Sequence, residues 1–140
     1  GAQISKAMLA EAGVTMNLQT QENVTMLTNG RKGDFEAYFT FWSGRPDPDG
    51  NVFTQRTCKG AQNDSHYCNA EVDALLTRAR QVAGPAERKK LYDQATEIMM
   101  RDIPRLLLWH RRVFTAYTAK LTGFTPYPDG IIRLRGLKLN

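Results

Sequence analysis

The stretch at residues 33–51, GDFEAYFTFWSGRPDPDGN, constrains the fold more than any other part of the chain. Apolar and other side chains alternate over residues 34–42, which is typical of a β-strand. One side of this strand would carry Phe35, Ala37, Phe39 and Phe41. Proline, glycine and aspartate dominate residues 43–51, a composition that ends a strand and predicts a rigid turn. Open α/β sheets bind ligands at the ends of such strands, so this loop is the candidate binding region.

Alternating helix and strand patterns fill the rest of the chain. We predict helices at 2–12, at 22–29, between Asn69 and Gly84, and at 86–101, and strands at 14–18, 106–109 and 113–118. Residues 46–67 are polar and predict a loop. The turn-rich tail beyond residue 121 predicts an edge strand or a tail that packs on a different neighbour. The predicted fold class is therefore α/β, with a mixed sheet flanked by helices.

The two helices around Gly84 should form a hairpin packed on the sheet. Asn69 is a good N-cap for the first, and Gly84 and Pro85 end it and start the second. Apolar side chains recur at spacings of three and four, at Val72, Leu75, Leu76, Ala79 and Val82, then at Leu91, Ala95, Ile98 and Met99. The charged Arg88, Lys89, Asp93 and Glu97 should face outward.

The two cysteines, Cys58 and Cys68, lie in the polar segment CKGAQNDSHYC. A zinc site needs four ligands, and only His66 and Asp64 are nearby, in no recognised spacing. We therefore predict a disulfide, which places the protein in an oxidising compartment. No signal peptide precedes Gly1, so we expect a fragment whose targeting sequence lies upstream.

Charge gives little support to a nucleic-acid partner. The net charge is +5, but the 19 basic residues are scattered and lack a known nucleic-acid-reading motif. A solvated basic surface is the favoured interpretation, and a basic nucleic-acid-binding module stays as an alternative. No apolar run approaches the roughly 20 residues of a membrane-spanning helix.

Several motifs in a fixed order resemble the family 5 extracellular solute-binding proteins, which are the dipeptide, oligopeptide and nickel receptors of bacterial ABC importers. The motifs are LAEAGVTMNLQ, GDFEAYFTFWSG with DPDG, YCNAEVDALLTRAR, ERKKLYDQATEIMMRDIPRLLLWH and TGFTPYPDG. Each motif alone is loose, whereas five in this order make a specific signal. The resemblance covers essentially all 140 residues and is to the C-terminal part of these proteins.

This resemblance implies a lobe of a type II-like periplasmic binding protein. Such a receptor captures a small molecule or peptide between two lobes, delivers it to a permease of the inner membrane, and performs no chemistry. Residues 1–114 would form part of the second lobe, and residues 115–140 would cross back to the first, N-terminal lobe, which is the missing partner. The resemblance implies a periplasmic location and no cofactor or metal.

The family's pattern also places the loop after Trp42 in the ligand cleft. The ring of Trp42 would pack against the ligand, the backbone of Ser43 and Gly44 would pair with it, and Asp47 is a further candidate contact. Several peptide receptors of the family have, three residues after the tryptophan, an aspartate that pairs with the ligand's α-amino group; here Arg45 takes that place. Because a guanidinium clamps carboxylates or phosphates, we expect an anionic ligand group at this end.

Other interpretations of these residues stay open. Trp42 also fits a core aromatic that closes the sheet, and Arg45 fits a solvated loop arginine. A secreted hydrolase would use Asp47, Asp49 and His66, but aspartates beside proline are ordinary turn formers, and no nucleophile is visible nearby. The binding-protein interpretation is therefore preferred.

Overall fold

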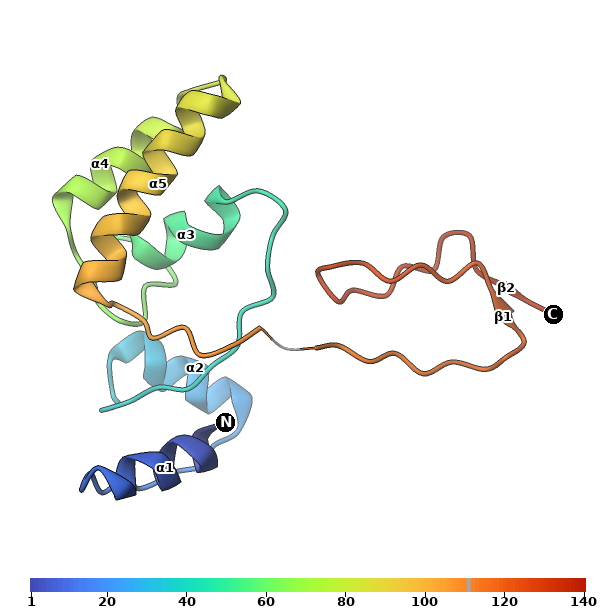
Figure 1. Cartoon of the computed structure of the whole chain (residues 1–140), viewed down its shortest axis with the longest axis horizontal. Helices are drawn as coiled ribbons and strands as arrows, with labels where there is room; N and C mark the ends of the chain where they lie inside the picture. The colour runs from blue at the N-terminus through green and yellow to red at the C-terminus, as the bar shows by residue number, and fades with distance from the viewer. Residues whose placement is uncertain (111) are drawn as a thin grey trace.

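The computed structural model describes residues 1–110 and 112–140, and this part of the chain is helix-rich with one small sheet (Figure 1). The helices are α1 (Ala2–Glu11), α2 (Asn23–Lys32), α3 (Asp49–Arg56), α4 (Ala70–Ala79) and α5 (Pro85–Asp102). The strands are β1 (Leu121–Thr122) and β2 (Lys138–Leu139). Arg111 lies outside the described residues.

The core lies between α4 and α5, which run side by side as the predicted hairpin, with α3 packed across α4 (Figure 1). The prediction that this hairpin packs on the sheet is wrong for the described residues, because α4 and α5 contact each other and α4 contacts α3, and neither contacts β1 or β2. The buried apolar side chains are Val72, Leu76, Ala79, Leu91, Ala95 and Ile98. Partly buried Val52 and Phe53 of α3 pack against this core. The predicted apolar faces of both helices are thus confirmed, because burial of a helix stripe follows directly from its spacing.

The ends of these two helices also follow the sequence. The Asn69 side chain accepts hydrogen bonds from the backbone N–H groups of Glu71 and Val72, so it caps α4 as predicted. Gly84 precedes α5 and Pro85 occupies its first turn. Ile103 has a positive φ of 47°, which ends α5 one residue before Pro104.

The prediction of a continuous loop at 46–67 is wrong, because α3 lies within it. Asp47 Oδ1 accepts a hydrogen bond from the Asp49 backbone N–H at 2.8 Å, and Pro48 stands at the N-cap position. The aspartate and proline of the DPDG turn therefore begin a helix rather than only a bend. Burial of Val52 and Phe53 then gives this short helix the tertiary contacts that it needs.

The predicted mixed sheet is present only in part. Within residues 1–110 and 112–140, the sheet consists of the antiparallel pair β1 and β2, in which Leu121 faces Leu139. The segments predicted as strands at 14–18, 34–42, 106–109 and 113–118 belong to no hydrogen-bonded ladder. Alternation in a sequence predicts an extended backbone, but a strand also needs a neighbour to pair with.

The run at 106–109 shows the consequence most clearly. A strand with an unbroken apolar run is expected to be buried on both faces, yet Leu106 is 71% exposed and Leu107 is 77% exposed. Trp109 is also exposed. A continuous exposed apolar run of this kind is typical of a surface that another part of a protein covers.

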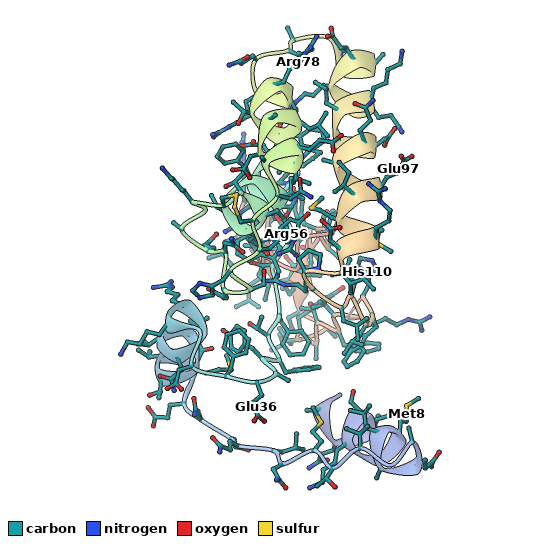
Figure 2. The ribbon with its side chains drawn as sticks, turned by 90° about the vertical axis from the view of Figure 1, so that its left-hand side faces the viewer. Met8, Glu36, Arg56, Arg78, Glu97 and His110 are labelled. Carbon is teal, nitrogen blue, oxygen red and sulfur yellow. A yellow bond between two sulfur atoms is a disulfide. The ribbon has the colours of Figure 1, made fainter. Side chains whose placement is uncertain are left out.

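The ends of the chain lie away from the hairpin. Helix α1 forms as predicted, but Ile4 and Met8 on its apolar face are exposed, and Figure 2 shows Met8 far from the hairpin. Beyond residue 112 the chain leaves the helices as a long arm that ends in β1 and β2 (Figure 1). The division into lobe segments at 1–114 and 115–140 stays a prediction.

Candidate functional site

The loop between Trp42 and α3 is organised around the side-chain amide of Asn51. Its oxygen accepts hydrogen bonds from Trp42 Nε1 at 3.0 Å and from the Arg45 backbone N–H at 2.7 Å. Its nitrogen donates to the backbone carbonyls of Arg45 at 2.8 Å and Asp47 at 3.1 Å. One side chain at the start of α3 therefore fixes both the indole and the backbone of the candidate loop.

Trp42 and Arg45 lie together at the surface. The Arg45 guanidinium carbon stands 5.4 Å from the centre of the Trp42 ring, within the range of a cation–π contact. Arg45 also donates to the backbone carbonyl and hydroxyl of Ser43 at 3.3 and 3.4 Å. Trp42 is 38% exposed and Arg45 is exposed, so a flat aromatic face and a cation are open to solvent side by side.

Asp47 is fully engaged with the helical hairpin. Arg88 donates to both carboxylate oxygens of Asp47, at 2.7 and 2.9 Å, and also to Tyr92 Oη and to the Ala79 carbonyl. The hydrogen bonds from Arg88 lower the pKa of Asp47, and the same bonds raise the pKa of Arg88. The prediction that Arg88 faces outward is therefore wrong: its side chain folds onto the loop and is 27% exposed.

Asp49 is held in a similar way. Its carboxylate forms an ion pair with Arg80 Nε at 3.1 Å, and the Arg80 guanidinium stacks over the Phe53 ring at 3.9 Å. Both aspartates of the DPDG turn thus connect the loop to α4 and α5. Each carboxylate forms an ion pair with an arginine, which suits a scaffold role.

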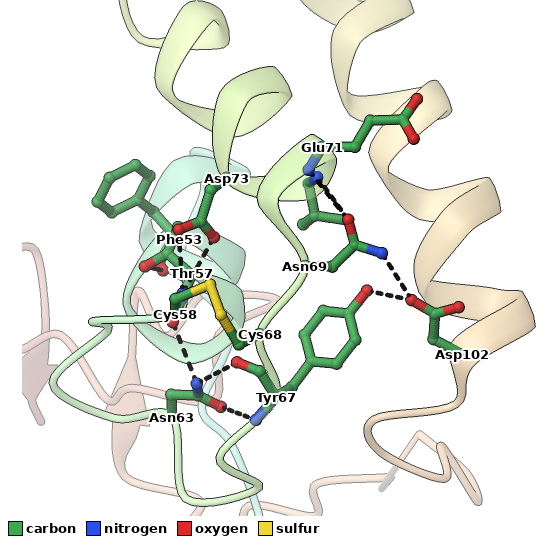
Figure 3. The surroundings of a disulfide bond; sticks show 11 residues. Phe53, Thr57, Cys58, Asn63, Tyr67, Cys68, Asn69, Glu71, Asp73 and Asp102 are labelled. Atoms are coloured by element: carbon green, nitrogen blue, oxygen red, sulfur yellow. Dashed lines mark hydrogen bonds between the residues drawn. A yellow bond between two sulfur atoms is a disulfide. The ribbon is translucent and has the colours of Figure 1, made fainter.

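The predicted disulfide between Cys58 and Cys68 is confirmed, with 4.3 Å between the two Cα atoms (Figure 3). The Asp73 carboxylate accepts the Cys58 backbone N–H, at 3.0 and 3.2 Å to its two oxygens. Within the loop, the Asn63 amide donates to the carbonyls of Thr57 and Tyr67. The disulfide thus joins the end of α3 to the residue before the cap of α4.

A second network ties this loop to the end of α5 (Figure 3). Tyr67 Oη donates to Asp102 Oδ2 at 2.5 Å, and Asn69 Nδ2 donates to the same oxygen at 3.0 Å. Burial and this bond to Asp102 raise the pKa of Tyr67 to about 12, and the bond lowers the pKa of Asp102. Asn69 therefore caps α4 and binds α5 with one side chain.

His66 lies apart from this chemistry. It borders a shallow polar hollow beside the disulfide, together with Arg31, Lys59 and Asp64. In the described part of the chain, no group of three or more histidine, cysteine or carboxylate side chains could hold a metal ion. No described helix is both long and apolar enough to cross a membrane.

Comparison with known proteins finds several binding proteins that are similar to the chain over most of its length. Di/tripeptide-binding protein 4 of Pseudomonas aeruginosa is 29% identical over 91% of the chain. The dipeptide-binding protein of Escherichia coli is 27% identical over 92%, and heme-binding protein A of Haemophilus influenzae is 28% identical over 99%. The solved structure of HbpA2 from Haemophilus parasuis is 28% identical and superposes on 99% of the chain with a TM-score of 0.74. No family model matches the chain.

The chain is similar over nearly its whole length to peptide- and heme-binding proteins of solute-binding family 5. The resemblance drawn from its motifs is thereby confirmed. The chain spans about a quarter of the length of these relatives, 25% for the two peptide-binding proteins and 26% for heme-binding protein A. These family 5 homologues are binding proteins rather than enzymes, and one is a peptide transport periplasmic protein from Haemophilus influenzae. The roles of Trp42, Ser43, Gly44, Arg45 and Asp47 in binding stay predictions.

The contribution of Asn51 is open to a direct test. With Trp109 replaced by phenylalanine, Trp42 is the remaining tryptophan, since the chain has two. Asn51→Ala should then shift Trp42 emission to longer wavelength and increase its quenching by acrylamide, because the indole N–H loses its acceptor. The free energy of unfolding should fall by about 1 to 2 kcal/mol, given the small net contribution of each hydrogen bond.

Asn51→Asp is the matched control for this substitution. It keeps an oxygen for Trp42 and for the Arg45 N–H but cannot donate to the two carbonyls. Its quenching should therefore lie between those of the wild type and Asn51→Ala. Identical quenching in all three proteins would show that Asn51 does not hold the indole.

Proposed function

We propose that the chain is part of a periplasmic receptor that captures a small solute between two lobes and delivers it to an ABC permease. The observation that carries this proposal is its similarity, over nearly its whole length, to peptide- and heme-binding proteins. Residues 1–114 form part of one lobe and residues 115–140 return to the other. Affinity arises from closure of the lobes, and no bond of the ligand is made or broken.

The other lobe is the first partner of the chain in this proposal. The exposed run at 106–109 supports this, because its apolar side chains lack cover and its backbone lacks a paired strand among the described residues. The length of the relatives, about four times that of the chain, leaves ample sequence to supply the cover. The disulfide supports a periplasmic location, since such bonds persist in oxidising compartments.

We place the ligand against Trp42, Ser43, Gly44 and Arg45. The exposed Trp42 ring offers a flat apolar surface, and the cation beside it attracts an anionic ligand group. Arg45 forms no ion pair with a carboxylate among residues 1–110 and 112–140, and its bonds to Ser43 are long, so it turns toward a ligand at little cost. Asp47 contributes indirectly, by fixing the loop through Arg88.

Replacing Arg45 tests this assignment in the full-length receptor. Arg45→Gln should weaken binding of an acidic ligand about ten- to a hundredfold, since a hydrogen bond to a charged group contributes about 1.5 to 3 kcal/mol. Isothermal titration calorimetry gives the affinity once screening has found a ligand. The screen covers acidic peptides and organic acids.

Two comparisons make the result specific. The amide or ester of the same ligand should bind wild type and Arg45→Gln alike, because it presents no charge for the guanidinium. Arg78→Gln removes an equal charge from an exposed ion pair and should leave affinity unchanged. Unchanged affinity in Arg45→Gln for the acidic ligand would remove the anion hypothesis while leaving the receptor proposal standing.

A further inference from the structure

Two arginines converge on one buried glutamine at the end of α3. Gln55 is 3% exposed. Arg105 donates to its side-chain oxygen at 2.6 Å, and Arg56 donates to its backbone carbonyl at 3.1 Å. Both arginines are partly buried, and Figure 2 shows Arg56 just below the α4–α5 hairpin. The cluster joins residues that are 50 positions apart in the sequence, Gln55 and Arg105.

The Gln55 amide has a donor without an acceptor. A guanidinium can only donate, so the amide oxygen must be the atom that faces Arg105. The Nε2 group is therefore fixed as the other atom, and it is buried with no hydrogen-bond partner in the described part of the chain. Buried donors in folded proteins are almost always paired, so an acceptor is expected here.

The cluster also lacks negative charge. Burial first, and then the nearby charge of Arg105, lower the pKa of Arg56 to about 10. Within residues 1–110 and 112–140, neither arginine forms an ion pair, whereas four other arginines do: Arg78, Arg80, Arg88 and Arg133. Two neighbouring cations that are partly desolvated need an anion to be stable.

We propose that Arg56, Arg105 and the Nε2 group of Gln55 bind a dissociable anionic group, a carboxylate or phosphate. Such a group has several acceptor oxygens and supplies both the missing acceptor and the missing charge. The site uses different residues from the loop at Trp42 and Arg45. It does not depend on the proposed receptor function, since a simple anion is enough to test it.

Calorimetric titration of the purified full-length protein with inorganic phosphate, at constant ionic strength in chloride, provides the test. Acetate is titrated in parallel, so that the carboxylate and phosphate arms are compared directly. The wild type should show saturable binding of at least one of these anions at a single site. Arg105→Gln should weaken that binding about tenfold or more, because a charged donor is lost.

Gln55→Glu is a second variant that keeps the proposal testable if Arg105→Gln fails to fold. The substitution places an acceptor and a negative charge between the two arginines at nearly constant volume. It should abolish anion binding and raise the melting temperature in chloride buffer free of phosphate and carboxylate. A structural defect would lower the melting temperature instead, so a fall overturns the proposal.

Arg78→Gln is the control for net charge, since it removes one positive charge from an exposed ion pair. It should bind phosphate and acetate like the wild type. An equal loss of binding in Arg78→Gln and Arg105→Gln would mean general electrostatic attraction and would overturn the site. Absence of saturable binding in the wild type would also overturn it.

Discussion

Replacing Leu76 with alanine should lower the free energy of unfolding by about 2 to 5 kcal/mol. Leu76 is 1% exposed and lies in the core cluster with Val72, Ala95 and Ile98. Truncation removes apolar contacts on α4 and leaves a cavity against α5, which close packing cannot fill without strain. The loss is a large part of the 5 to 15 kcal/mol that holds a typical domain folded. Urea unfolding followed by far-ultraviolet circular dichroism measures it.

Met100→Ala on α5 is the control for this prediction. Met100 is 67% exposed, so its truncation should change the free energy of unfolding by no more than about 0.5 kcal/mol. The contrast between the two variants tests whether the α4–α5 contact is the core that holds the chain together. Similarly small losses of unfolding free energy in both variants would show that the α4–α5 contact contributes little to the stability of the folded protein.

The hairpin could be predicted because its determinants are local in the sequence. The spacing of Val72, Leu76 and Ala79 defines a helix face whatever it packs against. The Asn69 cap and the Gly84–Pro85 boundary act on backbone groups within a few residues. Local rules of this kind therefore predict both the position of each helix and the face that it buries.

The strands and α3 could not be predicted in the same way, because each depends on a partner that the pattern does not name. Residues 34–42 alternate as a strand should, yet they have no paired neighbour among the described residues. Helix α3 is short and polar, and burial of Phe53 against the hairpin is what stabilises it. Turn formers such as Asp47 and Pro48 are compatible with a continuing loop and with the start of a helix.

In the candidate site, too, the local features could be predicted from the sequence and the long-range contacts could not. The aromatic and turn-rich composition at 42–51 indicated the loop, whereas the residues that hold it came only from the structure. Arg88 lies 41 positions from Asp47, and no local pattern connects them. The amide of Asn51, in a turn-rich segment, was the one visible signal of a loop organiser.

Together these contacts tie the loop to the helices at several points. Arg88 and Arg80 hold its two aspartates on the hairpin, and Asn51 holds Trp42 and the backbone at Arg45. A loop that is already ordered loses little conformational entropy on binding, so more of the contact energy becomes affinity. The same contacts give Asp47 and Asp49 a structural part in the loop, since each carboxylate forms an ion pair with an arginine.

Replacing both cysteines with serine should lower the free energy of unfolding by about 2 to 3 kcal/mol in the chain-entropy model. The disulfide between Cys58 and Cys68 closes a short loop, and its loss returns that conformational freedom to the unfolded chain. The loop is also held by the Asp73 carboxylate at Cys58 and by the bond from Tyr67 to Asp102. The folded state should therefore keep its helices, and the change should appear as a lower urea midpoint with unchanged far-ultraviolet spectrum.

Reductant separates this effect from that of the serine side chains. Dithiothreitol should lower the urea midpoint of the wild type toward that of the Cys58→Ser, Cys68→Ser variant and leave the variant itself unchanged. Thiol titration of the denatured, unreduced protein should find no reactive thiol, since the chain has two cysteines and both are paired. Two reactive thiols, or a wild-type midpoint insensitive to reductant, would contradict both the stabilising role of the bridge and the oxidising compartment that it implies.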